Sequence, residues 1–395
     1  MDRSIIPVAR PWLGEEEAAA ARRVILSGWV TQGPEVAAFE RDFAEYVGAT
    51  HACAVSSCTT ALHLALRTLG VGDGDEVITV SNSFIATANA VCYTGALPIF
   101  VDVDPYYHNI DPKKIEQAIT SKTRVILCVH QVGMPCDLKN ILEIARKHGL
   151  PLVEDAACAI GSEILWYDRW ERIGKPHGDI ACFSFHPRKL VTTGDGGMLT
   201  TGNADWDHKF RLWRQHSMSV ADTARHIAKQ VVFEEYVALG YNYRMTDIQA
   251  AVGREQLKRL PVMLERRRML AGRYAELLSG IPGIGLPKQP SWARSNWQSY
   301  CVRLPQQFDQ HCFMQNLLDE GISTRRGVMC THREPAFDSM PQCVRFSLTE
   351  SEAVQDRTII LPLYHQMTEA EQDRVVAAVA KTCTSFSALA HTELA

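Results

Sequence analysis

The first part of the chain has the hydrophobic rhythm of helices. Apolar residues recur every three or four positions through residues 14–48, which predicts two helices. Gly14 and the Gly33–Pro34 pair are the start signals of these helices, and Gly28 and Gly48 are their stop signals. We therefore expect a helical N-terminal segment that ends close to residue 50.

The pattern then changes to short apolar runs rich in β-branched residues. Helical stretches separate the earlier runs, and this alternation indicates an α/β fold with a mainly parallel, helix-covered sheet. Ligands of such sheets bind beyond the carboxyl ends of the strands, so the loops there are the expected place for chemistry. The expected strands are 52–55, 76–80, 98–103, 124–129, 152–154, 180–185 and 198–201, and the clearest helices among them are 59–69 and 138–148.

The second half begins with a capping-box pattern, Thr246 to Gln249. It opens a long helical stretch that Pro261 is expected to kink or interrupt, because proline lacks the backbone N–H that a helix needs. Residues 280–290 have the composition of a linker. Beyond them we expect a smaller α/β unit with strands near 298–304 and 359–361 and helices near 310–320 and 368–381.

Three parts follow from these patterns. We expect residues 1–50 to form an N-terminal helical segment that packs on the C-terminal domain, residues 51–279 to form a large ligand-binding domain, and residues 280–395 to form a small C-terminal domain.

Composition narrows the class of protein. With 41 basic and 45 acidic residues, the net charge of -4 leaves no electrostatic footprint for nucleic acid or an anionic membrane. No targeting or membrane-spanning pattern is visible, so we expect a cytoplasmic enzyme. The twelve cysteines form no C-x-x-C pair, so we expect reduced, mostly buried thiols and no metal site.

The most informative segment runs from Gly178 to Lys189 and continues to the glycines at 194–197. It places Lys189 just after a buried strand and before a glycine-rich turn, where the amine can reach a pocket at the strand end. A lysine of this kind, taken alone, is an ordinary solvated loop residue. Other segments of the chain are needed to assign a function to Lys189.

Two further segments supply that context. Asp155 ends a short apolar strand, where a carboxylate can hold a pyridinium nitrogen protonated, although it would equally serve as a helix N-cap. Residues 56–62 pass from a strand into a helix, and the N–H groups and hydroxyls at such a helix start form an anion site suited to a phosphate.

In this order, the three segments resemble pyridoxal-phosphate (PLP) enzymes of the aspartate-aminotransferase fold type. More narrowly, the chain resembles the DegT/DnrJ/EryC1/StrS family of sugar aminotransferases over nearly its whole length. Further segments with this resemblance are 81–87, 95–103, 240–251 and 361–364. The resemblance implies that PLP binds to the large domain, 51–279.

The resemblance also implies roles for particular residues. Lys189 would form the Schiff base with PLP, Asp155 would pair with the pyridine nitrogen, and Phe84 would stack on the cofactor ring. Asn242 would reach the cofactor phosphate of a neighbouring subunit, since family members are dimers with active sites at the interface. The phosphate would be held by Thr59, Thr60 and Ser184.

The chain departs from the family pattern at two cysteines. Cys58 replaces a glycine of the phosphate loop, and Cys158 replaces a glutamine that orients the cofactor's ring hydroxyl. A thiol is a shorter and weaker hydrogen-bonding group than an amide, so Cys158 is assigned to the cofactor site with a changed role. Family members that dehydrate sugars have histidine at the lysine position, so Lys189 favours transamination.

Candidate substrate-binding residues are His186, Arg325 and His332. His186 lies three residues before Lys189. Arg325 and His332 belong to a segment that approaches the substrate in the family, where cations can face a nucleotide diphosphate. Each of them alone would be read as a structural or solvated side chain.

These observations predict an aminotransferase that moves an amino group from L-glutamate to a keto-sugar, with a nucleotide-linked 3- or 4-keto-6-deoxyhexose as the first choice of acceptor. A homodimer is expected, without nucleic-acid or membrane partners. The alternatives are a cyclitol aminotransferase that acts on a keto-inositol, and a non-catalytic regulator that binds PLP or a sugar nucleotide.

Overall fold

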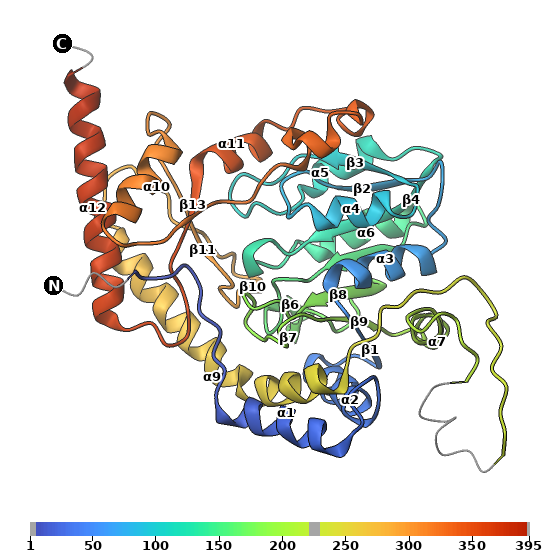
Figure 1. The fold of residues 1–395 in the computed structure, drawn as a ribbon. Helices are drawn as coiled ribbons and strands as arrows, with labels where there is room; N and C mark the ends of the chain where they lie inside the picture. Colours follow the sequence, from blue (N-terminus) through green and yellow to red (C-terminus); the bar gives the residue numbers. More distant parts are fainter. Residues whose placement is uncertain (1–4, 221–229, 393–395) are drawn as a thin grey trace.

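The computed structural model describes residues 5–220 and 230–392 of the chain (Figure 1). Its centre is a seven-stranded sheet in which only β9 runs against the direction of its neighbours; the other six strands point the same way. The predicted mainly parallel α/β sheet is confirmed. In spatial order the strands are β1 (His51–Val55), β9 (Gly197–Thr201), β8 (Ile180–Ser184), β5 (Leu152–Asp155), β4 (Thr123–Val129), β2 (Glu76–Val80) and β3 (Leu97–Val101).

Helices cover both faces of this sheet (Figure 1). Because alternate side chains of a strand point to opposite faces, the strands feed two separate cores. Leu127 of β4 lies in the core with α3 (Cys58–Thr68), α4 (Ala86–Cys92) and α7 (Ala204–Trp213). Its neighbours Ile126 and Cys128 lie in the core with α5 (Pro112–Ile115) and α6 (Leu138–Lys147).

The two predicted N-terminal helices are confirmed, α1 (Glu15–Ser27) and α2 (Pro34–Val47). Each ends at a glycine in the left-handed conformation, Gly28 (φ 77°) and Gly48 (φ 80°), which a residue with a Cβ adopts at a cost. Phe39 and Phe43 of α2 pack against Phe185 just after β8. The helix pair lies along α9 (Asp247–Leu278).

The helix α9 runs through Pro261, so the interruption that was one of the two expected effects of this proline does not occur. It starts at the predicted capping box of Thr246 and Gln249. Pro261 itself is exposed, while buried Leu257, Leu260 and Leu264 hold the flanking turns in the core. Tertiary packing here exceeds the cost of one missing hydrogen bond.

The C-terminal part has its own core. An antiparallel sheet, β11 (Tyr300–Arg303), β13 (Thr358–Leu361) and β12 (Arg325–Arg326), packs with α10 (Gln310–Asp319) and α12 (Glu369–Thr392). The end of α9 enters this core, and so does the N-terminus, where Ile6 pairs with Ile322. The remaining elements here are α11 (Thr349–Arg357) and short 3-10 turns at Thr331–Arg333, Pro335–Phe337 and Pro341–Cys343; two further turns of this kind lie at Glu116–Ala118 and Gln131–Gly133.

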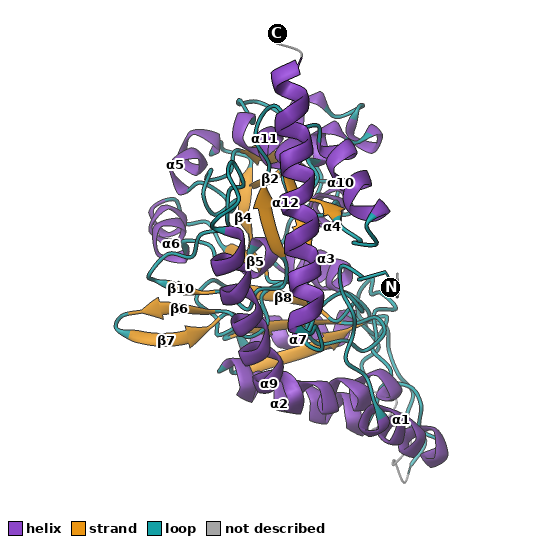
Figure 2. Cartoon of the chain, turned by 90° about the vertical axis from the view of Figure 1, so that its left-hand side faces the viewer, coloured by secondary structure: helices purple, strands orange, loops and turns teal. Residues whose placement is uncertain are grey.

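A hairpin of β6 (Glu163–Trp166) and β7 (Arg169–Arg172), extended by β10 (Ala293–Arg294), projects from the body (Figure 2). Its turn, Tyr167 and Asp168, has positive φ at both residues (42° and 66°), which suits the twist of a two-residue hairpin. All twelve cysteines of the chain are free, and nine are buried. Within residues 5–220 and 230–392, no helix combines the length and apolarity needed to cross a bilayer.

Candidate active site

The carboxyl ends of the parallel strands meet at one edge of the central sheet. Asp155 is the last residue of β5, Ser56 follows β1, Ser81 follows β2, and the loop with Lys189 follows β8. The topology therefore brings to one edge the segments that the sequence analysis singled out, which are far apart along the chain.

Asp155 is a buried carboxylate, only 5% exposed. Its Oδ2 accepts a hydrogen bond from the Thr87 hydroxyl (2.7 Å), and its Oδ1 accepts one from the backbone N–H of Ala157 (3.1 Å). Burial raises the pKa of Asp155, and these hydrogen bonds together with the nearby charge of Lys189 oppose that rise. A cation near Asp155, such as the amine of Lys189, therefore favours the ionised form of its carboxylate.

Lys189 is half-buried, and its Nζ donates to the Sγ of Cys158 (3.0 Å). Burial alone would lower the pKa of Lys189, but the sulfur of Cys158 and the carboxylate of Asp155 outweigh it and raise the pKa above the ordinary value. The geometry therefore brings Cys158, the departure from the family pattern, into direct contact with the candidate lysine.

The start of α3 is a capped helix N-terminus, the kind of position that suits an anion. Ser57 caps the helix by accepting from the N–H of Thr60 (3.2 Å), and the Thr60 hydroxyl bonds back to the backbone of Ser57. Gly197 lies so close that a Cβ would overlap the carbonyl group of Ser57, and Ser184 is its partner across the β8/β9 pair. Ser184 is thereby held beside the first turn of α3, where Thr59 is half-buried.

Phe84 lies between the end of β2 and the start of α4. Its ring is 63% exposed, an unusual state for a large aromatic side chain. The backbone around it is fixed, since the Ser83 hydroxyl bonds to Thr87, which in turn bonds to Asp155. An uncovered aromatic ring on a segment that is hydrogen-bonded to Asp155 suits a planar ligand.

The predicted substrate residues lie in different surroundings. His186 accepts a hydrogen bond at Nδ1 from the backbone of Arg188 (3.2 Å), within the lysine loop. Arg325 is exposed on β12. His332 bonds through one ring nitrogen to the Ser81 hydroxyl (2.7 Å) and through the other to Glu352 (3.1 Å). His332 therefore joins the C-terminal part to the strand edge.

Asn242 is exposed and forms a bridge with Gln215. It lies on the segment that returns from residue 230 toward α9, which Figure 1 shows running outside the body of the molecule. The carbonyl of the next residue, Tyr243, accepts a hydrogen bond from the N–H of Ser56 (2.8 Å), so Asn242 lies close to the start of α3 in its own chain.

Two features of the site have no role among the sequence-based predictions. Thr87, which holds Asp155, was part of a family segment but had no assigned role. His130 and Glu154 form a fully buried pair (2.9 Å). Because Nδ1 of His130 accepts the N–H of Cys136 (2.9 Å), its proton lies on Nε2 and is donated to Glu154. This pair supports the backbone next to Asp155, whose carbonyl accepts the N–H of His130 (3.1 Å).

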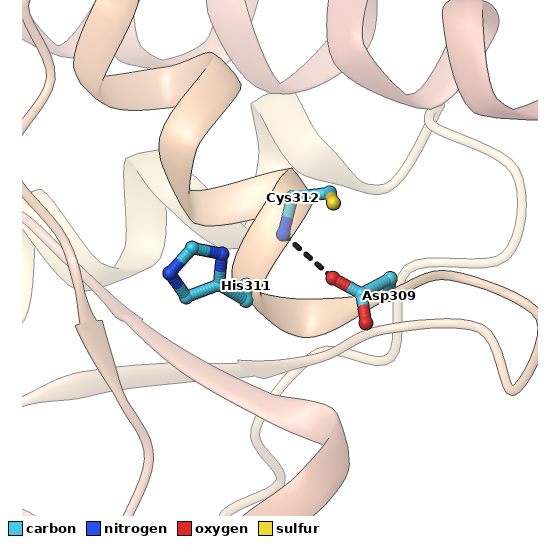
Figure 3. Close-up of side chains that lie close together, drawn as sticks. All are labelled: Asp309, His311 and Cys312. Atoms are coloured by element: carbon cyan, nitrogen blue, oxygen red, sulfur yellow. Dashed lines mark hydrogen bonds between the residues drawn. The ribbon is translucent and has the colours of Figure 1, made fainter.

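One group of potential metal ligands occurs among the described residues, at the start of α10: Asp309, His311 and Cys312 (Figure 3). All three are exposed, and Figure 3 shows the Asp309 carboxylate directed at the backbone N–H of Cys312 (2.7 Å), while the His311 ring points elsewhere. Asp309 is therefore the N-cap of α10, and this arrangement has the geometry of a helix cap.

This fold, with a lysine and a buried aspartate at the strand edge, is that of a PLP-dependent aminotransferase. The chain belongs to the DegT/DnrJ/EryC1/StrS aminotransferase family, whose sequence profile matches residues 11–380. It is a sugar aminotransferase, and its cofactor is pyridoxal 5'-phosphate.

Individual relatives agree in sequence and structure. The spore coat polysaccharide biosynthesis protein SpsC of Bacillus subtilis is 38% identical over 378 residues, which cover 95% of this chain and 96% of SpsC. The crystal structure of the aminotransferase TlmJ from Streptoalloteichus hindustanus is 33% identical, with a TM-score of 0.88 over 97% of this chain and 100% of TlmJ. Spr1654 of Streptococcus pneumoniae, in its PLP-form, is 26% identical, with a TM-score of 0.88 over 97% of this chain and 99% of Spr1654.

The residues present fit this cofactor. PLP carries a phosphate, a pyridine nitrogen and an aldehyde, which call for an anion site, a carboxylate and an amine. The start of α3, Asp155 and Lys189 supply these groups at one edge of the sheet, and Phe84, which follows β2 at the same edge, offers an uncovered ring.

Proposed function

We propose that this enzyme moves the amino group of L-glutamate to a keto-sugar carried on a nucleotide, a 3- or 4-keto-6-deoxyhexose. The observation that carries the catalytic part is that Lys189 and buried Asp155 lie at the same edge of the sheet, close enough to influence each other's pKa, together with the contact between Lys189 and Cys158. Perturbed titratable groups that meet in a partly desolvated site are typical of catalytic centres.

Bound PLP supplies an electron sink that stabilises negative charge at the α-carbon of the amino donor. Asp155 holds the proton of the pyridine nitrogen, a task that suits a buried carboxylate in need of a cationic partner. Thr87 and the N–H of Ala157 fix both carboxylate oxygens, so Asp155 keeps its orientation throughout the reaction.

Lys189 has two tasks in this proposal. Its Nζ attaches the cofactor, and when the donor's amine takes its place, the freed amine carries a proton away from the donor's α-carbon. General acid–base catalysis by one well-placed group is worth about 10²- to 10⁴-fold in rate. The half-buried position on a loop tied into β8 keeps the amine within the site between these steps.

The nucleotide part of the acceptor is assigned to the side of the C-terminal unit. Exposed Arg325 on β12 offers a guanidinium, which binds phosphate oxygens in a bidentate manner. The chain then continues to Cys330, which forms a bridge with Asn82 at the end of β2. His332 follows in contact with Ser81. These contacts support a diphosphate that lies between the C-terminal unit and the strand edge.

A homodimer is part of the proposal. Val231, Phe233 and Leu239 on the segment that leads to Asn242 are 85%, 88% and 94% exposed, an apolar surface that a second subunit would cover. If Asn242 acts on the partner's cofactor, mixing Asn242→Ala with Lys189→Ala should partly restore activity, because one site of a mixed dimer is intact. Mixtures as inactive as either variant would contradict this role.

The central test is the visible absorption spectrum of the PLP-loaded protein before and after L-glutamate. The wild type should show the band of lysine-bound cofactor, which glutamate removes, and Lys189→Ala should show no such band. Initial rates with glutamate and a keto-sugar nucleotide should give parallel double-reciprocal lines. Turnover of a keto-inositol instead would favour a cyclitol aminotransferase, and a band that no amino donor changes would indicate a non-catalytic binder.

A further inference from the structure

The loop Ser295–Ser299 connects β10 to β11 and contacts the backbone of Cys158 and Arg188, next to Lys189. Its sequence has no obvious functional pattern. Ser295, Asn296 and Gln298 on this loop are buried. Trp297 between them has the left-handed conformation (φ 52°), which costs energy for a residue with a Cβ and persists only where neighbours fix it. The contacts of the neighbouring side chains explain how this conformation is maintained.

The first reason is Asn296. Its Nδ2 donates to the carbonyls of Cys158 (2.8 Å) and Ile160 (2.9 Å), and its Oδ1 accepts the N–H of Gln298 (2.8 Å). Two of these bonds hold the turn that contains Cys158, and the third ties the fully buried amide to its own loop. Gly133 makes room for this side chain, since a Cβ there would overlap the Asn296 oxygen.

The second reason is Gln298. Its Nε2 donates to the carbonyl of Arg188 (2.6 Å), the peptide group that leads into Lys189. The loop itself is fastened to α9, because the Arg267 guanidinium donates to the carbonyls of Trp297 and Gln298 (2.7 Å each). The backbone next to Lys189 is thus held from the C-terminal side of the molecule.

Both ends of the sulfur–amine contact are therefore held by one loop. Asn296 holds the backbone of Cys158, and Gln298 holds the backbone just before Lys189. The Sγ of Cys158 and the Nζ of Lys189 then meet at 3.0 Å. A hydrogen bond is sensitive to displacements of a few tenths of an ångström, so a shift of either anchor changes the position of Nζ.

We propose that Asn296 and Gln298 are positioning residues for Lys189, which set the place of its amine through the backbone of Cys158 and Arg188. This inference rests on the proposed role of Lys189. It adds that a loop of the C-terminal part, and not only the large domain, determines how readily the lysine takes up cofactor.

The chain offers a matched control in Gln372 of α12. Its Nε2 also donates to a backbone carbonyl, that of Leu270 (2.9 Å), and its Oε1, like that of Gln298, has no hydrogen-bond partner in the structure. Both glutamines are buried, at 0% and 9% exposure. Gln298→Met and Gln372→Met therefore remove the same bond, and only the first touches the lysine loop.

The experiment measures the rate at which cofactor-free protein takes up PLP, from the growth of the absorption band, and the pH at which that band is half converted. Gln298→Met should load about tenfold more slowly and shift the pH midpoint, since misplacement of a reacting group costs up to about a hundredfold. Gln372→Met should match the wild type in both, while thermal unfolding shifts similarly in the two variants. If Gln298→Met loads like Gln372→Met with an unchanged midpoint, the proposal is wrong.

Two additions separate the possible failures. Gln298→Asn keeps a polar side chain but retracts the amide, so it should load slowly even if the methionine variant does not fold, and wild-type loading by it would overturn the proposal. Borohydride reduction followed by peptide mass spectrometry identifies the lysine that holds the cofactor in the wild type. Label on a lysine other than Lys189 would refute the proposed function itself, independently of Gln298.

Discussion

The Sγ of Cys158 accepts a hydrogen bond from the Nζ of Lys189 at 3.0 Å, so this thiol acts directly on the lysine. This contact raises the pKa of Lys189 against the opposing effect of burial. A protonated amine is not a nucleophile, so the contact restrains the attachment of cofactor until the proton leaves.

Cys158→Ala should therefore lower the pKa of Lys189. The neutral amine would be present at lower pH, and the pH profile of cofactor uptake should move to lower pH. Cys158→Ser, which keeps a weaker partner for the amine, should lie between alanine and wild type. Stopped-flow absorbance across a pH series measures this shift, and Cys312→Ala, at an exposed thiol on α10, serves as the control. An unchanged profile in Cys158→Ala would rule out the effect.

Phe84→Ala should weaken PLP binding without harming the fold. The ring is 63% exposed, so its removal should change stability by less than about 0.5 kcal/mol. Loss of stacking on the cofactor should cost roughly 0.5–1.5 kcal/mol, a two- to tenfold weaker affinity. Titration of cofactor-free protein with PLP tests this, and Phe84→Tyr should retain wild-type affinity. Equal affinities in all three proteins would remove Phe84 from the site.

Gly197→Ala should disturb the anion site. The new Cβ would overlap the carbonyl of Ser57 at the start of α3, and overpacking of this kind costs about 1–3 kcal/mol. Both the melting temperature and the affinity for PLP should fall. Gly202→Ala, just after the same strand, meets only an ordinary contact of 3.6 Å with Pro176 and should leave both unchanged. A Gly197 variant that binds PLP normally would show that the helix start tolerates movement.

Glu40→Gln should destabilise the large domain in a pH-dependent manner. Glu40 is buried between Arg214 and Arg211, and although burial opposes ionisation, the two guanidinium groups and the N–H of Ala54 hold its pKa below the ordinary value. Breaking such a buried pair costs about 3–5 kcal/mol.

The sign of this pH dependence follows from the lowered pKa. The stabilisation that ionised Glu40 gives the fold is complete above the pKa of a glutamate in the unfolded chain, about 4.3. It is lost as the pH falls through the lower pKa that Glu40 has in the folded state. Urea unfolding at neutral and acidic pH measures the free energy of unfolding of both proteins. The difference between wild type and Glu40→Gln should become smaller at acidic pH. Glu116→Gln, at an exposed pair with Lys147, should show little change at either pH. A gap that widens in acid would contradict the assignment.

The central sheet was accessible from sequence because its strands are short apolar runs between glycines and helical stretches, and local patterns determine such elements. Gly28 and Gly48 ended their helices as predicted, for the reason that only glycine adopts the required φ without cost. The continuity of α9 through Pro261 has a non-local cause, since leucines buried on both sides of the proline hold the helix in the core.

The supporting residues were beyond a single sequence for a related reason. Asp155 and Lys189 stand in recognisable segments, but Asn296, Gln298 and His130 are ordinary polar residues in their local context. Their importance lies in partners that are distant along the chain, such as Cys158 and Arg188. Only the folded arrangement reveals these pairs.

The pairing of Ile6 with Ile322, and of the Val8 carbonyl with the N–H of Leu363, joins the first described residues to the last structural unit. Contacts between such distant positions form late, because the chain must first close a long loop. During synthesis, Asp155 and Lys189 leave the ribosome well before the loop with Asn296 and Gln298, and the C-terminal core that includes Ile6 is completed last. We therefore expect the nascent enzyme to acquire a folded sheet first and a lysine in its final position only when its two ends have met.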